Sequence, residues 1–431
     1  MSTVWTDRFA TRTRGVTSSQ IRELLKFTQK PGMISFGGGL PAPEVFPVQR
    51  FQDACHKVLT EQSDTSLQYG ETEGYRPLRE LIANYTAREG VNAKVENVLI
   101  TSGSQQALDL IGKLFINEGD CVLVEAPTYL GALQAFNVYG ATYESVASDQ
   151  NGMCTDLLQE PLRSNPKFIY VLPNFQNPGG TTLSEERRHQ LVLLAERYGV
   201  PILEDDPYGQ LRYEGKHLPP LIALDHHNLH PAGGYSIGNV IYLSTFSKTL
   251  APGLRVGWIV APPEIIGKLT QLKQGADLHT STFNQFVAYE VAREGFLEQH
   301  VQLIRKIYRE RRDVMLQALT QFFPPEVTWT HPHGGLFLWV TLPQGSDMPA
   351  IFNSALEQNV AFVPGDSFFA KSNHERNNGC EARRHMRLNF SNAAPDQIRE
   401  GVRRLAAAVK ANLCGTLIPS EPPLEARQSR D

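Results

Sequence analysis

Short apolar runs recur along this chain with helical stretches between them, and this alternation limits the possible folds more than any other feature. The runs include Val98-Leu99-Ile100, Val122-Leu123-Val124, Phe168 to Leu172, Ile202-Leu203, Val240 to Leu243 and Trp258-Ile259-Val260. Unbroken apolar runs between helices are typical of parallel strands that are covered on both faces. We therefore predict an α/β domain over about residues 46–294, with a mostly parallel sheet and helices on both faces.

The pattern changes after about residue 294. We expect a long charged helix over about 299–322, strand-like segments at 335–340 and 386–390, and a final amphipathic helix over about 395–413. These elements predict a smaller α+β domain over residues 295–413. A polar surface loop is expected over 371–384, and residues 414–431 are rich in proline and charge, which favours a disordered tail.

Composition excludes several classes of protein. A hydrophobic content of 41% and a charged content of 20% are typical of a soluble globular chain. The net charge of -4 gives no electrostatic basis for binding nucleic acid or an anionic membrane. No apolar run approaches the roughly 20 residues of a membrane helix, and no signal peptide is expected in the polar stretch 1–14. Five scattered cysteines without a C-x-x-C favour reduced thiols, so we predict a cytoplasmic protein.

Lys248 is the first candidate for chemistry. It follows the apolar run 240–243 in Thr245-Phe246-Ser247-Lys248, and Arg255 comes seven positions later. The lysine therefore emerges at a strand end, where open α/β sheets place their ligands. A lysine that holds an aldehyde cofactor as a Schiff base suits such surroundings, with hydroxyls and a guanidinium gripping the cofactor's phosphate. The alternative is a solvated surface lysine.

The segment Thr101 to Leu108 joins a predicted strand to a helix N-terminus. Its small residues let the backbone approach an anion, and the unpaired N–H groups carry partial positive charge. Ser104 and Gln105 can also donate hydrogen bonds to a phosphate. The alternative is an ordinary serine helix cap without a ligand. The segment has neither the Walker A sequence nor the dinucleotide fingerprint G-x-G-x-x-G.

Carboxylates end another predicted strand, in Leu203-Glu204-Asp205-Asp206-Pro207-Tyr208. An aspartate at that depth can hold a pyridine nitrogen protonated, because the opposite charge favours the ionised form. Tyr208 can reach a phenolic oxygen. The alternatives are a helix cap and a metal carboxylate, and we predict no metal because no His or Cys lies near in sequence.

Two more strand ends carry an aromatic or an amide side chain. Tyr129 follows the run that ends at Glu125 and offers a flat face for stacking on an aromatic ring, although a core or surface tyrosine is the alternative. Asn177 has amide donors for a cofactor oxygen. It stands before Pro178 and a Gly-Gly pair, which is first of all a turn signal.

Arg387 lies inside the apolar segment Met386-Arg387-Leu388-Asn389-Phe390. A buried arginine is costly unless its charge is paired. The planar guanidinium matches a carboxylate in a bidentate fashion, so a substrate carboxylate is a natural partner. A structural ion pair is the alternative.

Taken in this order along the chain, the motifs resemble the class I and II aminotransferases of the pyridoxal-phosphate-dependent fold type I superfamily. The resemblance covers about residues 18–413, and the set is specific although each motif alone is weak. Residues 21–26 and 38–43 look closest to the 2-aminoadipate and kynurenine aminotransferase branch. The resemblance implies a large cofactor-binding domain, a smaller C-terminal domain, and an N-terminal arm over residues 1–45 that contributes to the small domain and the substrate entrance.

The resemblance also implies a role for each motif residue. Lys248 would carry pyridoxal 5'-phosphate as a Schiff base, Asp205 would pair with the pyridine nitrogen, and Tyr129 would stack on the ring. The other implied contacts are Asn177 and Tyr208 at the ring oxygen; Ser104, Gln105, Thr245, Ser247 and Arg255 at the phosphate, with Tyr69 from the neighbouring subunit; and Arg387, Asn177, Gly39 and Arg22 at the substrate. A homodimer with shared active sites follows from the role of Tyr69. Thr245 stands where many relatives carry serine, but the hydroxyl is kept.

The implied reaction moves the amino group of an L-amino acid to a 2-oxo acid such as 2-oxoglutarate by a ping-pong mechanism, with donors of the 2-aminoadipate, glutamate, aromatic or branched-chain type. Lys248 would act first as covalent anchor and then as proton carrier. A β-lyase or decarboxylase on the same scaffold is the alternative. A transcription regulator built on this fold is not expected, because such proteins carry an added N-terminal DNA-binding domain and the motifs here begin too early for one.

Overall fold

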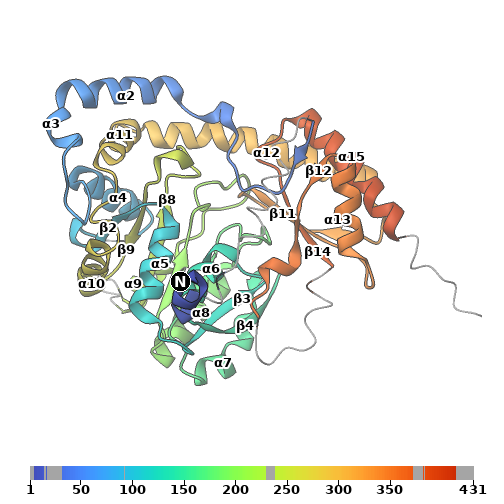
Figure 1. Ribbon diagram of the computed structural model, residues 1–431, viewed down its shortest axis with the longest axis horizontal. Helices are drawn as coiled ribbons and strands as arrows, with labels where there is room; N and C mark the ends of the chain where they lie inside the picture. The colour runs from blue at the N-terminus through green and yellow to red at the C-terminus, as the bar shows by residue number, and fades with distance from the viewer. Residues whose placement is uncertain are drawn as a thin grey trace, which may run out of the picture.

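In the computed structural model, an eight-stranded sheet lies between layers of helices, with a smaller four-stranded sheet beside it (Figure 1). The structure describes residues 4–13, 16, 32–91, 93–229, 238–371, 382 and 384–413. Arg22, most of the predicted loop 371–384 and the predicted tail 414–431 lie outside these residues. None of the helices in the described ranges has both the length and the apolar character needed to cross a membrane.

The apolar runs form the strands of the large sheet. In spatial order these are β2 (Val98–Thr101), β9 (Gly257–Val260), β8 (Val240–Thr245), β7 (Ile202–Asp205), β6 (Ile169–Val171), β3 (Cys121–Ala126), β4 (Thr142–Asp149) and β5 (Gly152–Met153). The central strands β8, β7, β6, β3 and β4 are parallel, as predicted. The polar strand β4 was not predicted. Most of its residues are only partly buried, so it lacks the apolar signature of the central strands.

One strand runs opposite to the prediction. β9 is antiparallel to β8 and to β2, whereas its apolar run was expected to be a parallel strand. The connection from β8 to β9 spans residues 246–256 and contains only the short 3-10 turn η6 (Pro252–Leu254). A parallel neighbour needs a crossover of a dozen or more residues, usually a helix, so this short connection turns the chain back. The connection 246–256 carries both Lys248 and Arg255.

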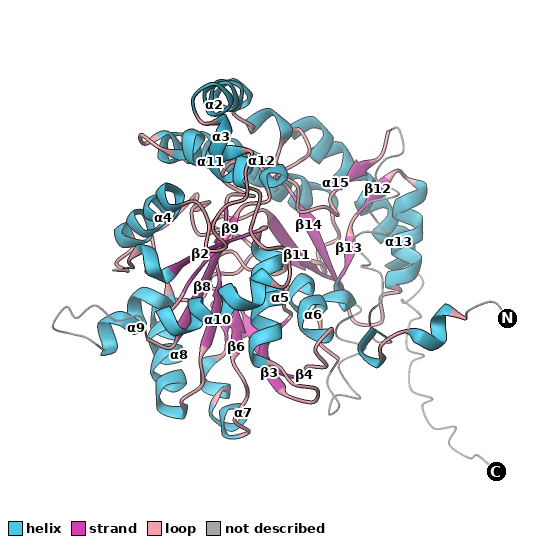
Figure 2. Cartoon of the chain, turned by 60° about the vertical axis from the view of Figure 1, so that its left-hand side comes forward, coloured by secondary structure: helices cyan, strands magenta, loops and turns pink. Residues whose placement is uncertain are grey.

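Both faces of the large sheet are buried, because alternate residues of each strand enter different apolar clusters. One face packs against α5 (Ser104–Phe115), α6 (Leu130–Asn137) and α10 (Pro263–Gln274). The other packs against α2 (Val48–Glu61), α4 (Arg76–Arg88), α7 (Gln159–Arg163), α8 (Glu185–Tyr198), α9 (Leu221–Leu229) and α11 (Thr282–Ala292). Figure 2 shows the strands inside the molecule with these helices around them. The short helix α3 (Ser63–Ser66) follows α2.

The C-terminal part has the expected mixture of helices and strands. The long helix is α12 (Phe296–Phe322), which runs from beside α11 to α15 (Pro395–Leu413) (Figure 1). The smaller sheet is antiparallel, in the order β10 (Thr328–Trp329), β11 (Phe337–Thr341), β14 (His385–Asn389) and β13 (Val363–Pro364). α13 (Met348–Glu357) packs against α15, and β1 (Ile34–Ser35) pairs with β12 (Val360–Ala361).

Candidate active site

The polar residues singled out in the sequence gather where the parallel strands end. Asp205 is the last residue of β7, Thr245 is the last residue of β8, and Lys248 follows three positions later. Ser104 begins α5, just beyond β2. Tyr129 follows β3 in the same manner. Because the carboxyl ends of parallel strands meet at one edge of a sheet, side chains distant in sequence share one site.

Lys248 reaches from this edge to the N-terminal segment of the chain. Its Nζ donates a hydrogen bond of 2.8 Å to the carbonyl of Gly39. Desolvation lowers the pKa of Lys248 to about 8, and the positive charges of Arg387 and Arg255 act in the same direction. The side chain is therefore not the solvated surface lysine of the alternative interpretation, and its neutral amine is accessible near neutral pH.

The three adjacent carboxylates at the end of β7 have different partners. Glu204 accepts hydrogen bonds from the backbone N–H groups of Leu221 and Ile222 at the start of α9, so the helix-cap role belongs to Glu204. Asp206 accepts from the side chain of Asn174 and from the turn at Gly209. Both residues serve the scaffold, which leaves Asp205 as the carboxylate available to a ligand.

Asp205 is buried and only half satisfied. Its Oδ2 accepts a hydrogen bond of 2.9 Å from the hydroxyl of Tyr170, while its buried Oδ1 has no partner among the described residues. Burial raises the pKa of Asp205 to about 7, and the hydrogen bond from Tyr170 opposes that shift. A buried acceptor without a partner is costly, so this oxygen is suited to a ligand that brings an N–H group.

Sequence reasoning missed Tyr170, which was interpreted only as part of an apolar strand. Tyr170 pairs in register with Leu203, and Asp205 lies two residues further along β7. Residues two apart on a strand share a face, so Tyr170 and Asp205 lie on the same side of the sheet. The only available signal was a single tyrosine within an apolar run, on the strand next to the one that ends in Asp205.

Arg387 enters the site from β14 of the smaller sheet. Its Nη1 donates to Oδ1 of Asn177 at 2.7 Å, and its Nη2 donates to the carbonyl of Gly37 at 2.6 Å. The guanidinium lies over the rings of Phe337, at 4.3 Å, and Phe368, at 5.0 Å. No carboxylate accepts from it in the described ranges, and its buried Nε has no partner there. The structural ion pair of the alternative interpretation is therefore absent from this part of the chain.

The N-terminus of α5 is open to an anion. The residue that caps the helix is Gly103, with φ 79° and no side-chain cap hydrogen bond, so the alternative of a serine cap is wrong. Residues other than glycine rarely adopt this φ, so glycine suits the position, and a Cβ there would also displace the guanidinium of Arg255. Arg255 donates to the carbonyl of Ser102 at 3.2 Å. A guanidinium beside free helical N–H groups forms a strong site for a phosphate.

Hydroxyl groups continue this polar surface on the turn after β8. Thr245 Oγ1 donates 3.0 Å to the carbonyl of Val256 and lies 2.9 Å from Ser247 Oγ, and both side chains are buried. Ser247 also lies 3.5 Å from Nη1 of Arg255. The threonine hydroxyl thus keeps the turn closed and brings Ser247 and Arg255 to the same place as the start of α5.

Two tyrosines line the same region. Burial raises the pKa of Tyr129 and of Tyr208, and the charge of Asp205 acts in the same direction on both phenols. Tyr208 also packs edge-on against Phe337, with ring centroids 5.9 Å apart. Gln105 does not point freely at the loop, because its Nε2 donates 2.8 Å to the carbonyl of Gly131.

One predicted residue does not join this group within the chain. Tyr69 is 77% exposed, and its nearest aromatic contact is an edge-on packing against His279. Arg22, which was predicted to contact the substrate, lies outside the described residues.

Further scaffold residues went unnoticed in the sequence. Arg188 is fully buried and donates to the side chain of Asn174 and to the carbonyl of Pro173, and so supports the turn that carries Asn177. Glu125 accepts from the N–H of Leu172 and stands at the end of β3. Both are charged residues in buried positions, which was the only signal that the sequence offered.

The site matches a particular kind of ligand. It presents an amine that can react with an aldehyde, a helix N-terminus with an arginine and hydroxyls for a phosphate, and a buried carboxylate with an unpartnered oxygen for a protonated ring nitrogen. Pyridoxal 5'-phosphate carries all three groups. Together with the large α/β sheet, these features define a pyridoxal-phosphate-dependent enzyme of fold type I.

Comparison with known proteins identifies the family. The family model for aminotransferase class I and II matches residues 35–405. The chain is 44% identical to aromatic-amino-acid aminotransferase 1 of Thermococcus litoralis, over 94% of each chain, and 45% identical to 2-aminoadipate transaminase of Thermus thermophilus, over 95% of this chain and 98% of the relative. The chain belongs to the class I and II aminotransferases, and its cofactor is pyridoxal 5'-phosphate.

A solved structure agrees with this assignment. The α-aminoadipate aminotransferase LysN of Thermus thermophilus, in complex with N-(5'-phosphopyridoxyl)-L-leucine, is 41% identical, with a TM-score of 0.86. The match covers 96% of this chain and all of that one. The fold type I architecture predicted from the sequence is confirmed. The β-lyase or decarboxylase alternative is not favoured by any of these relatives.

Proposed function

We propose that the chain transfers the amino group of an L-amino acid of the 2-aminoadipate, glutamate, aromatic or branched-chain type to a 2-oxo acid such as 2-oxoglutarate. One observation carries this proposal. Lys248 and Arg387 hydrogen-bond to the carbonyls of Gly39 and Gly37, respectively. Carbonyls two residues apart are separated by at most about 7 Å, so the amine and the carboxylate clamp converge on a space that suits one amino acid.

Arg387 is the proposed partner of the substrate α-carboxylate. Its guanidinium is already oriented by Asn177 and Gly37, so little conformational freedom is lost when the substrate arrives. Burial lowers the pKa of Arg387 to about 10, which still leaves the group charged at neutral pH. A fixed, desolvated positive charge attracts a carboxylate strongly.

The proposed cofactor contacts follow the same geometry. Asp205 holds the ring nitrogen, Tyr129 stacks on the ring, and Asn177 and Tyr208 meet the ring oxygen. The phosphate is assigned to Ser104, Gln105, Thr245, Ser247 and Arg255. When bound, pyridoxal 5'-phosphate supplies the aldehyde for covalent attachment and a ring that accepts the electron pair released at the substrate's Cα.

The residues of the chain then perform the proton chemistry. The neutral amine of Lys248 takes the proton from Cα of the substrate as a general base. It then delivers the proton to the cofactor's carbon as a general acid. Its lowered pKa keeps a useful fraction neutral near pH 7 to 8. Asp205, as a carboxylate, favours the protonated ring nitrogen through its opposite charge. Arg387 keeps the substrate oriented throughout.

The test is a panel of amino donors with 2-oxoglutarate. The proposal expects one 2-oxoglutarate consumed for each 2-oxo acid formed, with parallel lines in double-reciprocal plots, which are the kinetic sign of a ping-pong mechanism. Product formation without consumption of 2-oxoglutarate would instead favour the lyase or decarboxylase. The donor with the highest kcat/KM identifies the substrate.

We further propose a homodimer in which Tyr69 reaches the phosphate in the neighbouring subunit. The exposure of Tyr69, and its position on a segment held by His279, support this role. Co-expression of Tyr69→Ala with Lys248→Ala tests it. Each variant alone should be inactive or nearly so, and mixed dimers should regain activity because one of their two sites is intact. Failure of complementation, or a monomer in sedimentation, would refute the shared site.

The remaining assignments are proposals of the same kind. We take the protein to be cytoplasmic. Its large domain would span residues 46–294 and its small domain residues 295–413, and residues 1–45 would contribute to the small domain. The pairing of β1 with β12 supports the last point. Gly39 would lie beside the substrate, because its carbonyl meets Lys248 and its Cα faces Phe337. Arg22 would contact the distal group of the substrate, and Arg22→Ala should then alter the ranking of donors.

A further inference from the structure

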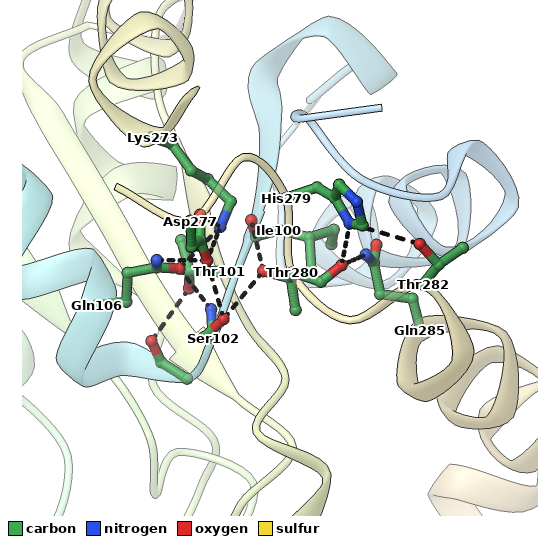
Figure 3. Close-up of polar contacts among 11 residues, drawn as sticks. Ile100, Thr101, Ser102, Gln106, Lys273, Asp277, His279, Thr280, Thr282 and Gln285 are labelled. Carbon is green, nitrogen blue, oxygen red and sulfur yellow. Dashed lines mark hydrogen bonds and ion pairs between the residues drawn. The ribbon is translucent and has the colours of Figure 1, made fainter. Parts of the chain in front are cut away.

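An ion pair between buried Lys273 and exposed Asp277 lies at the C-terminal end of α10, beside the loop at residues 101–104. The side chain of Lys273 is fully buried, and its Nζ lies 2.8 Å from each carboxylate oxygen of Asp277 (Figure 3). The same ammonium group donates to Oε1 of Gln106 at 2.9 Å. Removing a lysine from water is costly unless its charge is paired, so the buried Lys273 depends on its contacts with Asp277 and Gln106.

The ion pair and Gln106 hold Ser102 through hydrogen bonds to its backbone and to its side chain. Asp277 Oδ2 accepts from Nε2 of Gln106 at 2.6 Å and from the hydroxyl of Ser102 at 3.2 Å. Oε1 of Gln106 accepts from the backbone N–H of Ser102 at 2.7 Å. Both the backbone and the side chain of Ser102 are therefore tied to the cluster of Lys273, Asp277 and Gln106, as Figure 3 shows.

Ser102 is the residue through which the cluster can act on the cofactor site. Its carbonyl accepts from Nη2 of Arg255, and the next residue, Gly103, caps α5. The position of Ser102 thus sets both the guanidinium and the free N–H groups at the helix start. None of the three cluster residues is itself among the proposed phosphate contacts.

The segment that follows Asp277 also contacts the region of Tyr69. Thr280 Oγ1 lies 3.4 Å from the hydroxyl of Ser102, and its carbonyl accepts from Gln285 (Figure 3). One residue earlier, Nε2 of His279 accepts from the N–H of Gly70 at 3.3 Å. Residues 273–285 therefore connect the loop at 101–104 to the segment at 69–70.

We propose that Lys273, Asp277 and Gln106 are positioning residues that set the shape of the phosphate-binding loop and thereby the contribution of the phosphate to cofactor affinity. The inference rests on the proposed assignment of the phosphate to Ser104 and Arg255. An ion pair outside the proposed cofactor contacts, with Lys273 buried and Asp277 exposed, would then have a measurable effect on the binding of one chemical group of the cofactor.

The test compares two ligands that differ only in the phosphate. The affinities of the apoprotein for pyridoxal 5'-phosphate and for pyridoxal are measured by absorbance titration for the wild type, Lys273→Met and Asp277→Asn. Lys268→Met is the matched control, because Lys268 lies on the same helix, is exposed, and donates a hydrogen bond to Gln271, outside the cluster. Circular dichroism and the melting temperature of each apoprotein report on folding.

We expect Lys273→Met and Asp277→Asn to weaken binding of pyridoxal 5'-phosphate about tenfold while leaving the affinity for pyridoxal unchanged, since one charge-assisted network is lost. The control should match the wild type with both ligands. Equal losses of affinity for the two ligands would mean a general structural role, and wild-type affinities for both ligands would mean that the cluster has no role at the phosphate. Either result would overturn the inference.

Two further outcomes keep the test decisive. If Lys273→Met and Asp277→Asn fail to fold, Ser102→Ala removes the hydrogen bond from the side chain of Ser102 to Asp277 while leaving the ion pair and the Ser102 carbonyl in place. A smaller loss, of about threefold and again specific to the phosphate, is then expected, and no loss would overturn the inference. If the wild type itself binds both ligands equally, the phosphate assignment under the proposed function fails, and this inference fails with it.

Discussion

The hydroxyl of Tyr170 donates a hydrogen bond of 2.9 Å to one oxygen of Asp205, and the other oxygen of that carboxylate has no partner among the described residues. Burial and the charge of Asp205 raise the pKa of Tyr170 well above its usual range, so the phenol stays protonated and remains the donor. The bond therefore favours the ionised carboxylate and fixes its orientation. The free oxygen is left for the ring nitrogen of the cofactor.

Tyr170→Phe should lower kcat/KM about tenfold at neutral pH, because one hydrogen bond to a charged group is lost. Without the hydroxyl, the pKa of Asp205 rises above about 7, and more of the carboxyl is neutral at any given pH. The loss should consequently be larger at pH 6.5 than at pH 8.5. A pH–rate profile measures this, with Tyr198→Phe on the outer helix α8 as control. A loss that is independent of pH would contradict the electrostatic role.

Lys248→Ala should abolish turnover together with the visible absorbance of the bound cofactor, because no other residue is proposed as covalent anchor and proton carrier. The absorbance spectrum after dialysis against pyridoxal 5'-phosphate and a transamination assay measure the two effects. Lys268→Ala, on the exposed side of α10, is the control and should retain both. Retention of colour and turnover by Lys248→Ala would refute the role of the lysine.

Uptake of the cofactor by the apoprotein should depend on pH through Lys248. The pKa of about 8 lies below the usual value for lysine, and only the neutral amine attacks an aldehyde. Well below pH 8 the rate constant should rise about tenfold for each pH unit, and it should level off above pH 8. Stopped-flow absorbance between pH 6.5 and 9.5 measures the curve. A rate constant that still rises about tenfold per pH unit up to pH 9.5, as an exposed lysine with a pKa near 10.5 gives, would show that the site does not desolvate the amine.

Arg387→Lys should reduce kcat/KM for amino acid substrates about a hundredfold. A lysine ammonium has three donors and no planar fork, so bonds to Asn177 and Gly37 would leave it one donor, which cannot hold a carboxylate in a bidentate fashion. The affinity of the apoprotein for the cofactor should change little. Steady-state kinetics with saturating 2-oxoglutarate and a cofactor titration separate the two effects. Arg399→Lys, an exposed change on α15, is the control, and an equal loss in both variants would argue against the clamp.

The sequence by itself determined the parallel α/β core and the positions where polar residues leave it. An apolar run and the residue that ends it are neighbours in the chain, so Asp205, Thr245 and Lys248 were placed at strand ends from local pattern alone. The helix at 395–413 was predicted with the bounds that α15 has, because its amphipathic repeat is also local.

Only the tertiary structure decided how these pieces meet. The direction of β9, the hydrogen bond from Tyr170 to Asp205 and the cluster around Lys273 join residues whose separation along the chain carries no local signal. Arg387 reaches Asn177 across 210 positions, because the folded chain brings β14 of the smaller sheet beside the turn that carries Asn177. Side-chain partners of this kind depend on the packing of whole elements, and packing is a property of the folded chain and not of any segment of it.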